Sequence, residues 1–146
     1  MMKTVGFLYR CIGASVVALG AVSAAQAGSL VVSVDTGEAN GTLRAAVYDS
    51  QASYDAEKLV AGAASPADGG SAIVKFDGLE PGTYGVAVFL DMNGNDELDT
   101  NLFGAPTEPY GFSMNPQMGF AAPKFDAFRF EHDGTDQQLT IQLHGN

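Results

Sequence analysis

The apolar segment from Thr83 to Leu90 constrains the fold of this 146-residue chain more than any other stretch. In an extended strand, successive side chains point to opposite faces. Both faces are apolar here, with Val86, Val88 and Leu90 on one and Ala87 and Phe89 on the other. Because a strand that is apolar on both faces must be covered on both, the segment predicts a central strand within a β-sandwich.

Shorter segments with β-branched or alternating apolar residues predict the remaining strands. They are Ser29–Asp35, Thr42–Tyr48, Ser71–Phe76, Phe125–Glu131 and Gln138–Leu143. We expect the first two to pair as a hairpin across the turn at Gly37–Gly41. Pro81-Gly82 suits a type II turn, and Asp133-Gly134 suits a hairpin between the last two strands.

The connecting segments predict one helix and two loops. Ser50–Gly62 predicts a helix of about two or three turns that Ser53 could cap. Ala63–Gly70 reads as a loop, and Leu102–Pro123 as a long ordered loop folded over one end of the sheet. The predicted fold is therefore all-β: an antiparallel Greek-key sandwich of about seven strands with one short helix.

The N-terminus has the pattern of a secretory signal peptide. Lys3 and Arg10 precede and border an apolar run, and Ala25-Gln26-Ala27 forms a small-x-small cleavage site. A transmembrane anchor is the alternative, but the run is shorter than the ~20 residues that a span requires. We expect cleavage after Ala27, a secreted or periplasmic location, and a single domain over residues 28–146.

The formal net charge of −10 becomes more negative once Lys3 and Arg10 are removed. This charge disfavours nucleic acid and anionic membrane surfaces as partners, and it favours cations. Simple solubility outside the cytoplasm is the alternative explanation. Cys11, the only cysteine, lies within the predicted signal peptide, so the mature domain has no disulfide. We expect a monomer, with an extracellular carbohydrate or protein as a possible partner.

The segment Asp91–Asn101, directly after the central strand, is rich in oxygen-bearing side chains. Calcium takes six to eight oxygen ligands from a flexible loop, and alternate positions here can supply most of them. The candidate metal ligands are Asp91, Asn93, Asn95, the carbonyl of Glu97, Asp99 and Asn101, with Asp96, Glu108 or water completing the set. A solvated Asx turn is the alternative.

This loop departs from an EF-hand in two ways. Asp96 stands at the sixth position, where EF-hands have Gly, and Leu102 stands at the twelfth, where they have a bidentate Glu. The flanking segments also read as a strand and a loop. We therefore expect a modest-affinity structural calcium site outside the EF-hand class.

Two resemblances follow from these motifs. The run from Phe76 to Tyr84 is similar to the turn and strand of prealbumin-like (transthyretin-like) sandwiches, including adhesin B-type repeats. Gly78–Phe130, with its Tyr-Gly-Phe-Ser element, resembles a family of secreted bacterial proteins known as domain of unknown function twenty-one forty-one. Asp96 and Leu90 depart from that family, whose members often have Gly and His there. The resemblance implies a fold and a compartment, and no established activity.

An enzymatic function is not expected. Asp91 and Glu108 could be imagined as the carboxylate pair of a hydrolase, but a metal site or polar loop explains them more simply. His132 and His144 lack metal-spaced partners. The candidate partner-binding residues are Glu108, Tyr110, Phe112 and Phe120, and the three aromatic ones are either core or a platform for a sugar or peptide.

Overall fold

The computed structural model describes residues 27–145, so the predicted signal peptide lies outside the described residues apart from Ala27. Eight elements follow one another along the chain: β1 (Gly28–Tyr48), α1 (Gln51–Asp55), β2 (Ala61–Leu79), β3 (Gly82–Asp91), β4 (Tyr110–Phe112), α2 (Phe125–Phe128), β5 (Arg129–His132) and β6 (Gln137–Gln142). Neither of the two described helices is long and apolar enough to span a membrane.

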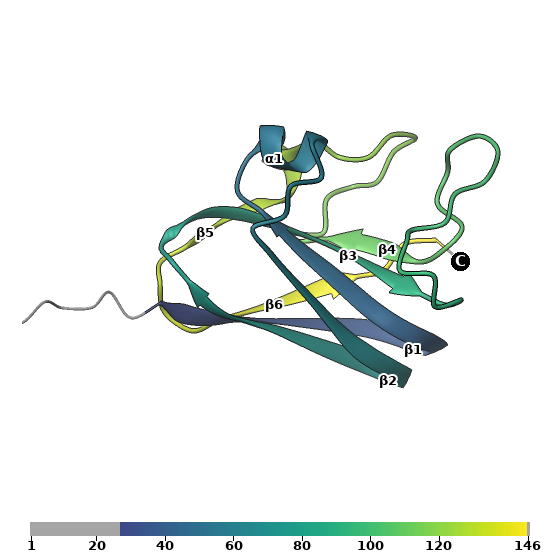
Figure 1. The fold of residues 1–146 in the computed structure, drawn as a ribbon, viewed down its shortest axis with the longest axis horizontal. Coiled ribbons are helices and arrows are strands. Elements are labelled where there is room, and N and C mark those ends of the chain that lie inside the picture. Colours follow the sequence, from purple (N-terminus) through teal and green to yellow (C-terminus); the bar gives the residue numbers. More distant parts are fainter. Residues whose placement is uncertain (1–26, 146) are drawn as a thin grey trace, which may run out of the picture.

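The longest feature of the fold is an antiparallel hairpin of β1 and β2. The first half of β1 also pairs in parallel with β6, and its second half pairs antiparallel with β3. β3 in turn pairs with β4 and β5 at different points along its length. Figure 1 shows β1 and β2 running together through the molecule, and all six described strands belong to one hydrogen-bonded sheet.

The hairpin bends where two glycine segments face each other. Gly37 pairs with Gly70, and the register shifts on both sides of Gly37. Both residues have positive φ angles, 57° at Gly37 and 91° at Gly70, which glycine adopts without the clash that a Cβ would cause. Bulges of this kind bend a strand and increase its twist.

The bend lets both halves of the sheet contribute to one core. Leu30, Val32 and Val34 from the first half of β1 are fully buried with Val86 and Leu90 of β3. Phe76 of β2 and Ile141 of β6 belong to the same cluster. In the first half of β1 and in β2 from Ala72 to Phe76, alternate residues face inward, as the period of an extended chain requires.

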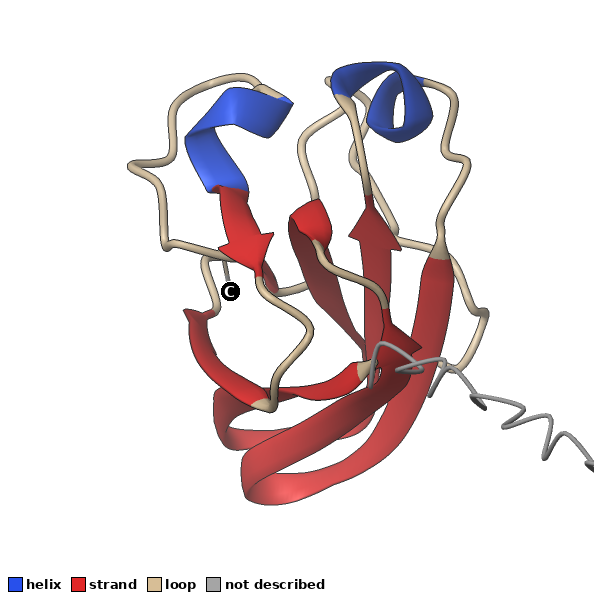
Figure 2. Cartoon of the chain, turned by 90° about the vertical axis from the view of Figure 1, so that its left-hand side faces the viewer, coloured by secondary structure: helices blue, strands red, loops and turns tan. Residues whose placement is uncertain are grey.

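A second, aromatic cluster covers the opposite face of β3. Its buried members are Tyr48, Phe112, Phe125 and Phe128. Figure 2 shows α1 and α2 at the same end of the sheet, where Tyr54 of α1 packs against Phe128 with ring centroids 5.1 Å apart. A Cβ on Gly85 would lie 2.5 Å from the Phe128 ring, so glycine at this position lets α2 approach β3.

The predicted fold class is confirmed, whereas the predicted pairing of the first two strands is wrong. The all-β class is confirmed, with six strands. The predicted strands Ser29–Asp35 and Thr42–Tyr48 are two halves of β1, so they do not form a hairpin with each other. Ala63–Gly70, predicted as a loop, lies within β2. This segment is poor in β-branched residues and has Pro66, which is compatible with β2 because β2 lies at the edge of the sheet.

The helix predictions need two corrections. The helix expected at Ser50–Gly62 is reduced to Gln51–Asp55, capped by Ser50 in a capping box with Ser53. The start of the predicted strand Phe125–Glu131 is the helix α2, and β5 begins only at Arg129. Phe125 and Phe128, three positions apart, thereby turn the same way into the aromatic cluster.

The turn predictions also change. Gly82 does not adopt the positive φ that a type II turn at Pro81-Gly82 requires, whereas Gly78 does, at 77°. The predicted hairpin at Asp133-Gly134 is not formed. The turn connects β5, which pairs with β3, to β6, which pairs with β1, so the two strands do not pair with each other.

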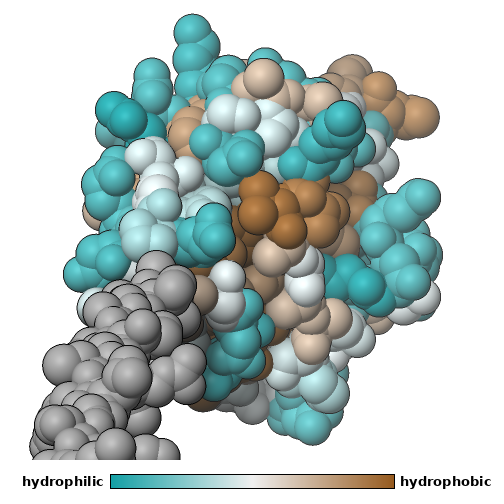
Figure 3. Space-filling view, turned by 60° about the vertical axis from the view of Figure 1, so that its left-hand side comes forward, coloured by the Kyte–Doolittle hydropathy of each residue, from teal (hydrophilic) through white to brown (hydrophobic). Residues whose placement is uncertain are grey.

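On the face shown in Figure 3, hydrophilic residues predominate and hydrophobic ones gather near the centre.

Candidate functional site

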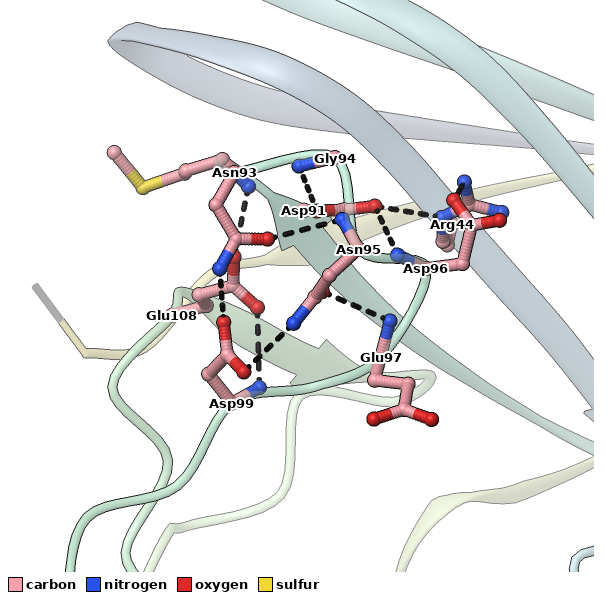
Figure 4. Close-up of polar contacts among 10 residues, drawn as sticks. Arg44, Asp91, Asn93, Gly94, Asn95, Asp96, Glu97, Asp99 and Glu108 are labelled. Carbon is pink, nitrogen blue, oxygen red and sulfur yellow. Dashed lines mark hydrogen bonds and ion pairs between the residues drawn. The ribbon is translucent and has the colours of Figure 1, made fainter.

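The loop that leaves β3 is organised around the buried carboxylate of Asp91, which is 1% exposed. Its Oδ1 accepts a hydrogen bond from the backbone N–H of Gly94 at 2.7 Å. Its Oδ2 accepts from Arg44 Nε and from the backbone N–H of Asp96, both at 3.0 Å. Figure 4 shows Asp91 between Arg44 and the loop backbone, so this carboxylate folds the loop back on itself.

The charge state of Asp91 follows from these contacts. Burial alone acts to raise the pKa of the carboxyl, because it removes water from the charged form. The hydrogen bonds from Arg44, Asp96 and Gly94 outweigh burial, so the pKa of Asp91 lies below its ordinary value. Arg44 also forms an ion pair with Asp96, which adopts a positive φ of 68°. One guanidinium therefore bridges two carboxylates and offsets part of their negative charge.

Glu108 fastens the loop from its other end. Its side chain is buried, at 5% exposure. Oε1 accepts from the backbone N–H of Met92 at 2.8 Å, and Oε2 accepts from that of Asp99 at 3.2 Å. Leu90 also donates its backbone N–H to the carbonyl of Pro109, next to Glu108. The start and end of the loop are thus tied to the strand that returns into β4.

Two carboxamides converge on Asp99 at the mouth of the loop (Figure 4). Asn95 Nδ2 donates to Asp99 Oδ1 at 2.8 Å, and Asn93 Nδ2 donates to Oδ2. Asn93 and Asn95 use their Oδ1 atoms to accept backbone N–H groups two residues onward, as in Asx turns. Three oxygen-bearing side chains therefore meet at one point through N–H groups.

The structure divides the predicted ligand set. Asn93, Asn95 and Asp99 lie together, and Asp91 and Glu108 lie beneath them. At Glu97 the predicted ligand is the backbone carbonyl, and the side-chain carboxylate points away from the cluster in Figure 4. In the described part of the chain, no three His, Cys, Asp or Glu side chains are grouped to hold a metal, so a cation at this loop would depend on the carboxamides.

Asn101 belongs to a separate small hairpin. Its Oδ1 accepts from the backbone N–H groups of Phe103 and Ala105, and Thr100 forms a bridge with Pro106. We define the 99–107 hairpin as the segment that begins at Asp99 and closes where the N–H of Thr107 donates to the Asp99 carbonyl at 2.8 Å. Leu102 and Phe103 at its tip are 101% and 94% exposed.

The predicted aromatic residues do not form a common platform. Phe112 is buried in the aromatic cluster and Tyr110 packs beside it with ring centroids 6.2 Å apart, whereas Phe120 is fully exposed. Glu108, the fourth candidate, is buried. Of the large apolar side chains that the structure exposes in and beside the acidic loop, Leu102 and Phe103 of the 99–107 hairpin are the most exposed, and Met92 and Leu98 of the loop itself are partly exposed.

Neither carboxylate of the imagined hydrolase pair has an oxygen left without a donor. Both oxygens of Asp91 and both oxygens of Glu108 accept hydrogen bonds within the loop. His132 is buried against Tyr84, with its Nδ1 3.0 Å from Gln137 Oε1. These contacts account for the three side chains as parts of the scaffold.

Sequence reasoning missed Arg44, on which the acidic loop depends, and the structural role of Ser113 near the aromatic cluster. Arg44 comes from β1, 47 positions before Asp91, and no local pattern connects them. Its signal was its position in an otherwise apolar strand. Ser113 is fully buried; its hydroxyl donates to the Phe128 carbonyl and accepts from the Val86 N–H at 2.9 Å. Ser113 therefore joins β3, α2 and the end of the Tyr-Gly-Phe-Ser element.

The fold and the site define an all-β protein whose central strand ends in an acidic loop that is held by hydrogen bonds among its own residues. The chain belongs to the family described as "Uncharacterized protein conserved in bacteria (DUF2141)", whose model matches residues 32–140. This match confirms the family suggested by the sequence motifs. Searches of curated proteins and of solved structures found no match.

Proposed function

We propose that this protein is an exported, non-enzymatic binding module that presents the 99–107 hairpin to a partner protein. In this proposal, calcium bound at Asn93, Asn95 and Asp99 fixes the base of the hairpin. The alternative of carbohydrate or peptide recognition then rests on Leu102 and Phe103 in place of Tyr110, Phe112 and Phe120.

The observation that carries the proposal is the exposure of Leu102 and Phe103 on a braced hairpin. Two adjacent large apolar side chains with almost no burial contribute little to folding. Yet the hairpin is held by bonds at Asn101 and at Thr107. Because the tip is already ordered, a partner would pay little conformational entropy to bind it.

Calcium is supported by the chemistry at Asp99. Asn93 and Asn95 now present N–H groups to this carboxylate, and the terminal amide can rotate to present oxygen instead. A hard cation would then replace the N–H groups between the three side chains. This exchange gives up the Asx-turn bonds to Asn95 and Glu97, consistent with a modest affinity.

Calorimetric melting of residues 28–146 with EDTA and with excess calcium tests the metal. We expect calcium at about a hundred times its Kd to stabilise the fold by about 2–3 kcal/mol. Asp99→Asn should abolish the response, whereas Glu97→Gln, which removes the same charge from a side chain directed away from the cluster, should retain it. An identical melting temperature in EDTA and calcium would refute the calcium site.

A photo-crosslinking amino acid at position 103 tests the hairpin. In the producing bacterium, position 103 should give a discrete protein adduct, and position 73 should not, although Ile73 of β2 is also exposed. The adduct should disappear when Leu102 is changed to Ser. Equal labelling from both positions would contradict a specific role for the hairpin.

A further inference from the structure

The bend of β1 contains a stretch of backbone that only one neighbouring strand holds. The parallel pairing of β1 with β6 ends at Asp35, and its antiparallel pairing with β3 begins at Thr42. Within residues 27–145, the intervening residues 36–41 pair with β2 alone, and Glu38 and Ala39 stand where β2 has a single residue. Figure 1 shows the bend at the lower right edge of the molecule. One edge of this backbone is therefore open to another protein.

Asn40, in this stretch, has a side chain that the fold does not use. It is exposed, and its carboxamide makes no hydrogen bond within the part of the chain that the structure describes. The other described asparagines all bond through their side chains: Asn93, Asn95, Asn101 and Asn115. Asn40 also lacks the positive φ that asparagine tolerates better than most residues. The bend therefore gives no reason for a carboxamide at this position.

The residues around Asn40 match the acceptor pattern of N-glycosylation. Asn40-Gly41-Thr42 has the form Asn-x-Ser/Thr, and the 146 residues contain no other such triplet. Bacterial oligosaccharyltransferases also select an acidic residue two positions before the asparagine, and Glu38 stands there. Glu38 is exposed and forms no ion pair with another described residue. Its carboxylate is therefore available to pair with an arginine of an enzyme.

We propose that Asn40 is the acceptor of an N-linked oligosaccharide. The donor is an oligosaccharide carried on a polyprenyl pyrophosphate, and Asn40 Nδ2 forms a bond to C1 of its first sugar. The bond between C1 and the pyrophosphate oxygen breaks, the lipid pyrophosphate leaves, and one amide proton passes to a base of the transferase. Glu38 and the Thr42 hydroxyl are the groups by which the enzyme recognises the site. Because this transfer takes place outside the cytoplasm, the proposal rests on the proposed export.

Mass spectrometry of the protein purified from the producing bacterium tests the proposal. We expect the exported form to exceed the mass of its polypeptide by that of an oligosaccharide, and fragmentation that preserves glycans should place the added mass on Asn40. Asn40→Gln should remove the added mass, and it should not change the melting temperature of unglycosylated protein made in a host without the transferase. An exported chain with an unmodified Asn40 would overturn the glycosylation and leave the proposed export standing. A chain found only in the cytoplasm would overturn both.

Substitutions in the bend test recognition by the transferase. Glu38→Gln should lower the glycan occupancy of Asn40 at least about tenfold, because it removes the charge that pairs with the enzyme. Asp35→Asn is the matched control: it removes another exposed carboxylate, keeps the Oδ1 acceptor for the Gly37 N–H, and should leave occupancy unchanged. Thr42→Val should abolish occupancy, whereas Thr42→Ser keeps the hydroxyl and should retain it. Equal occupancy in the Glu38 and Asp35 variants would overturn the proposed recognition.

Discussion

The two ends of β3 are covered in different ways. Near Gly85 the strand lies under aromatic rings, with Phe112 and Phe128 at a centroid distance of 4.9 Å. At Asp91 it passes into a loop held by hydrogen bonds to two buried carboxylates. Apolar contacts depend on buried area and not on direction, whereas hydrogen bonds to Asp91 and Glu108 depend on geometry and protonation. The acidic end is therefore the one that can respond to ions and pH.

The largest expected effect is at the aromatic end. Phe128 is fully buried and contacts Tyr54, Phe112 and Phe125. Phe128→Ala should lower the free energy of unfolding by about 3–5 kcal/mol, because it leaves a cavity that the rings cannot fill. Urea denaturation measures the change. Phe120→Ala, at a fully exposed ring, is the matched control and should stay within about 0.5 kcal/mol.

The next effect is at the acidic end. Glu108→Ala leaves the N–H groups of Met92 and Asp99 without their acceptor, which should cost about 2 kcal/mol. Glu97→Ala removes an exposed carboxylate from the same loop and should be near neutral. Urea denaturation compares the two. If both variants are equally stable, the loop does not depend on its buried carboxylate and the contrast with the aromatic end fails.

Lowering the pH should perturb the acidic end of β3 before the aromatic end. The folded-state pKa of Asp91 is lower than the ordinary value of 3.8. Its stabilising contribution is therefore present above that value and is lost as the pH falls through the lowered folded pKa. In NMR spectra recorded from pH 6 downward, the Gly94 and Asp96 amides should shift before the signals of Phe112 and Phe128 do.

Asp91→Asn is the variant that checks the cause of this pH response. Without the titrating carboxyl, the early shift of the Gly94 and Asp96 amides should disappear. Asp133 and Asp136 also have lowered pKa values through bonds from Thr135 and Ser29, so the turn before β6 serves as an internal reference. An acidic loop and an aromatic cluster that change together would mean that the two ends are one cooperative unit.

The smallest expected effect is at the tip of the 99–107 hairpin. Leu102→Ser and Phe103→Ser should each change the free energy of unfolding by less than about 0.5 kcal/mol, because neither side chain is buried. Thermal denaturation is a sufficient measurement. A loss of stability as large as that of Glu108→Ala would show that these side chains support the fold and are not free to bind a partner.

The parts of the fold that local pattern determines were predictable. The continuous apolar run of β3 and the oxygen-rich run from Asp91 both signal their structure within about ten residues. Pairing was not predictable, because β1 meets β6 more than a hundred positions away and Arg44 meets Asp91 across the sheet. The alanine-rich start of β2 is a strand through its pairing with β1 and not through its own propensity.

The sequence located the candidate site at the loop after β3, and its role in binding calcium stays a prediction. The cluster of Asn93, Asn95 and Asp99 was expected, but nothing local distinguishes these residues from Asp91 and Glu108, which the fold buries. Burial depends on what covers a residue, and here the cover comes from β1 and from the chain entering β4. Phe112 and Phe120 both follow a glycine in the sequence. Phe112 is nevertheless buried and Phe120 exposed, because only Phe112 is covered by other parts of the fold.

The bent hairpin of β1 and β2 has a consequence for the order of folding. Its two strands are neighbours along the chain, so the entropy lost in closing the connection between them is small. Once this hairpin has formed, both halves of β1 are in place to pair with later strands. β6 must then find β1 across almost the whole length of the domain. Long-range pairing is slow compared with hairpin formation, so the parallel contact between β1 and β6 should set the folding rate.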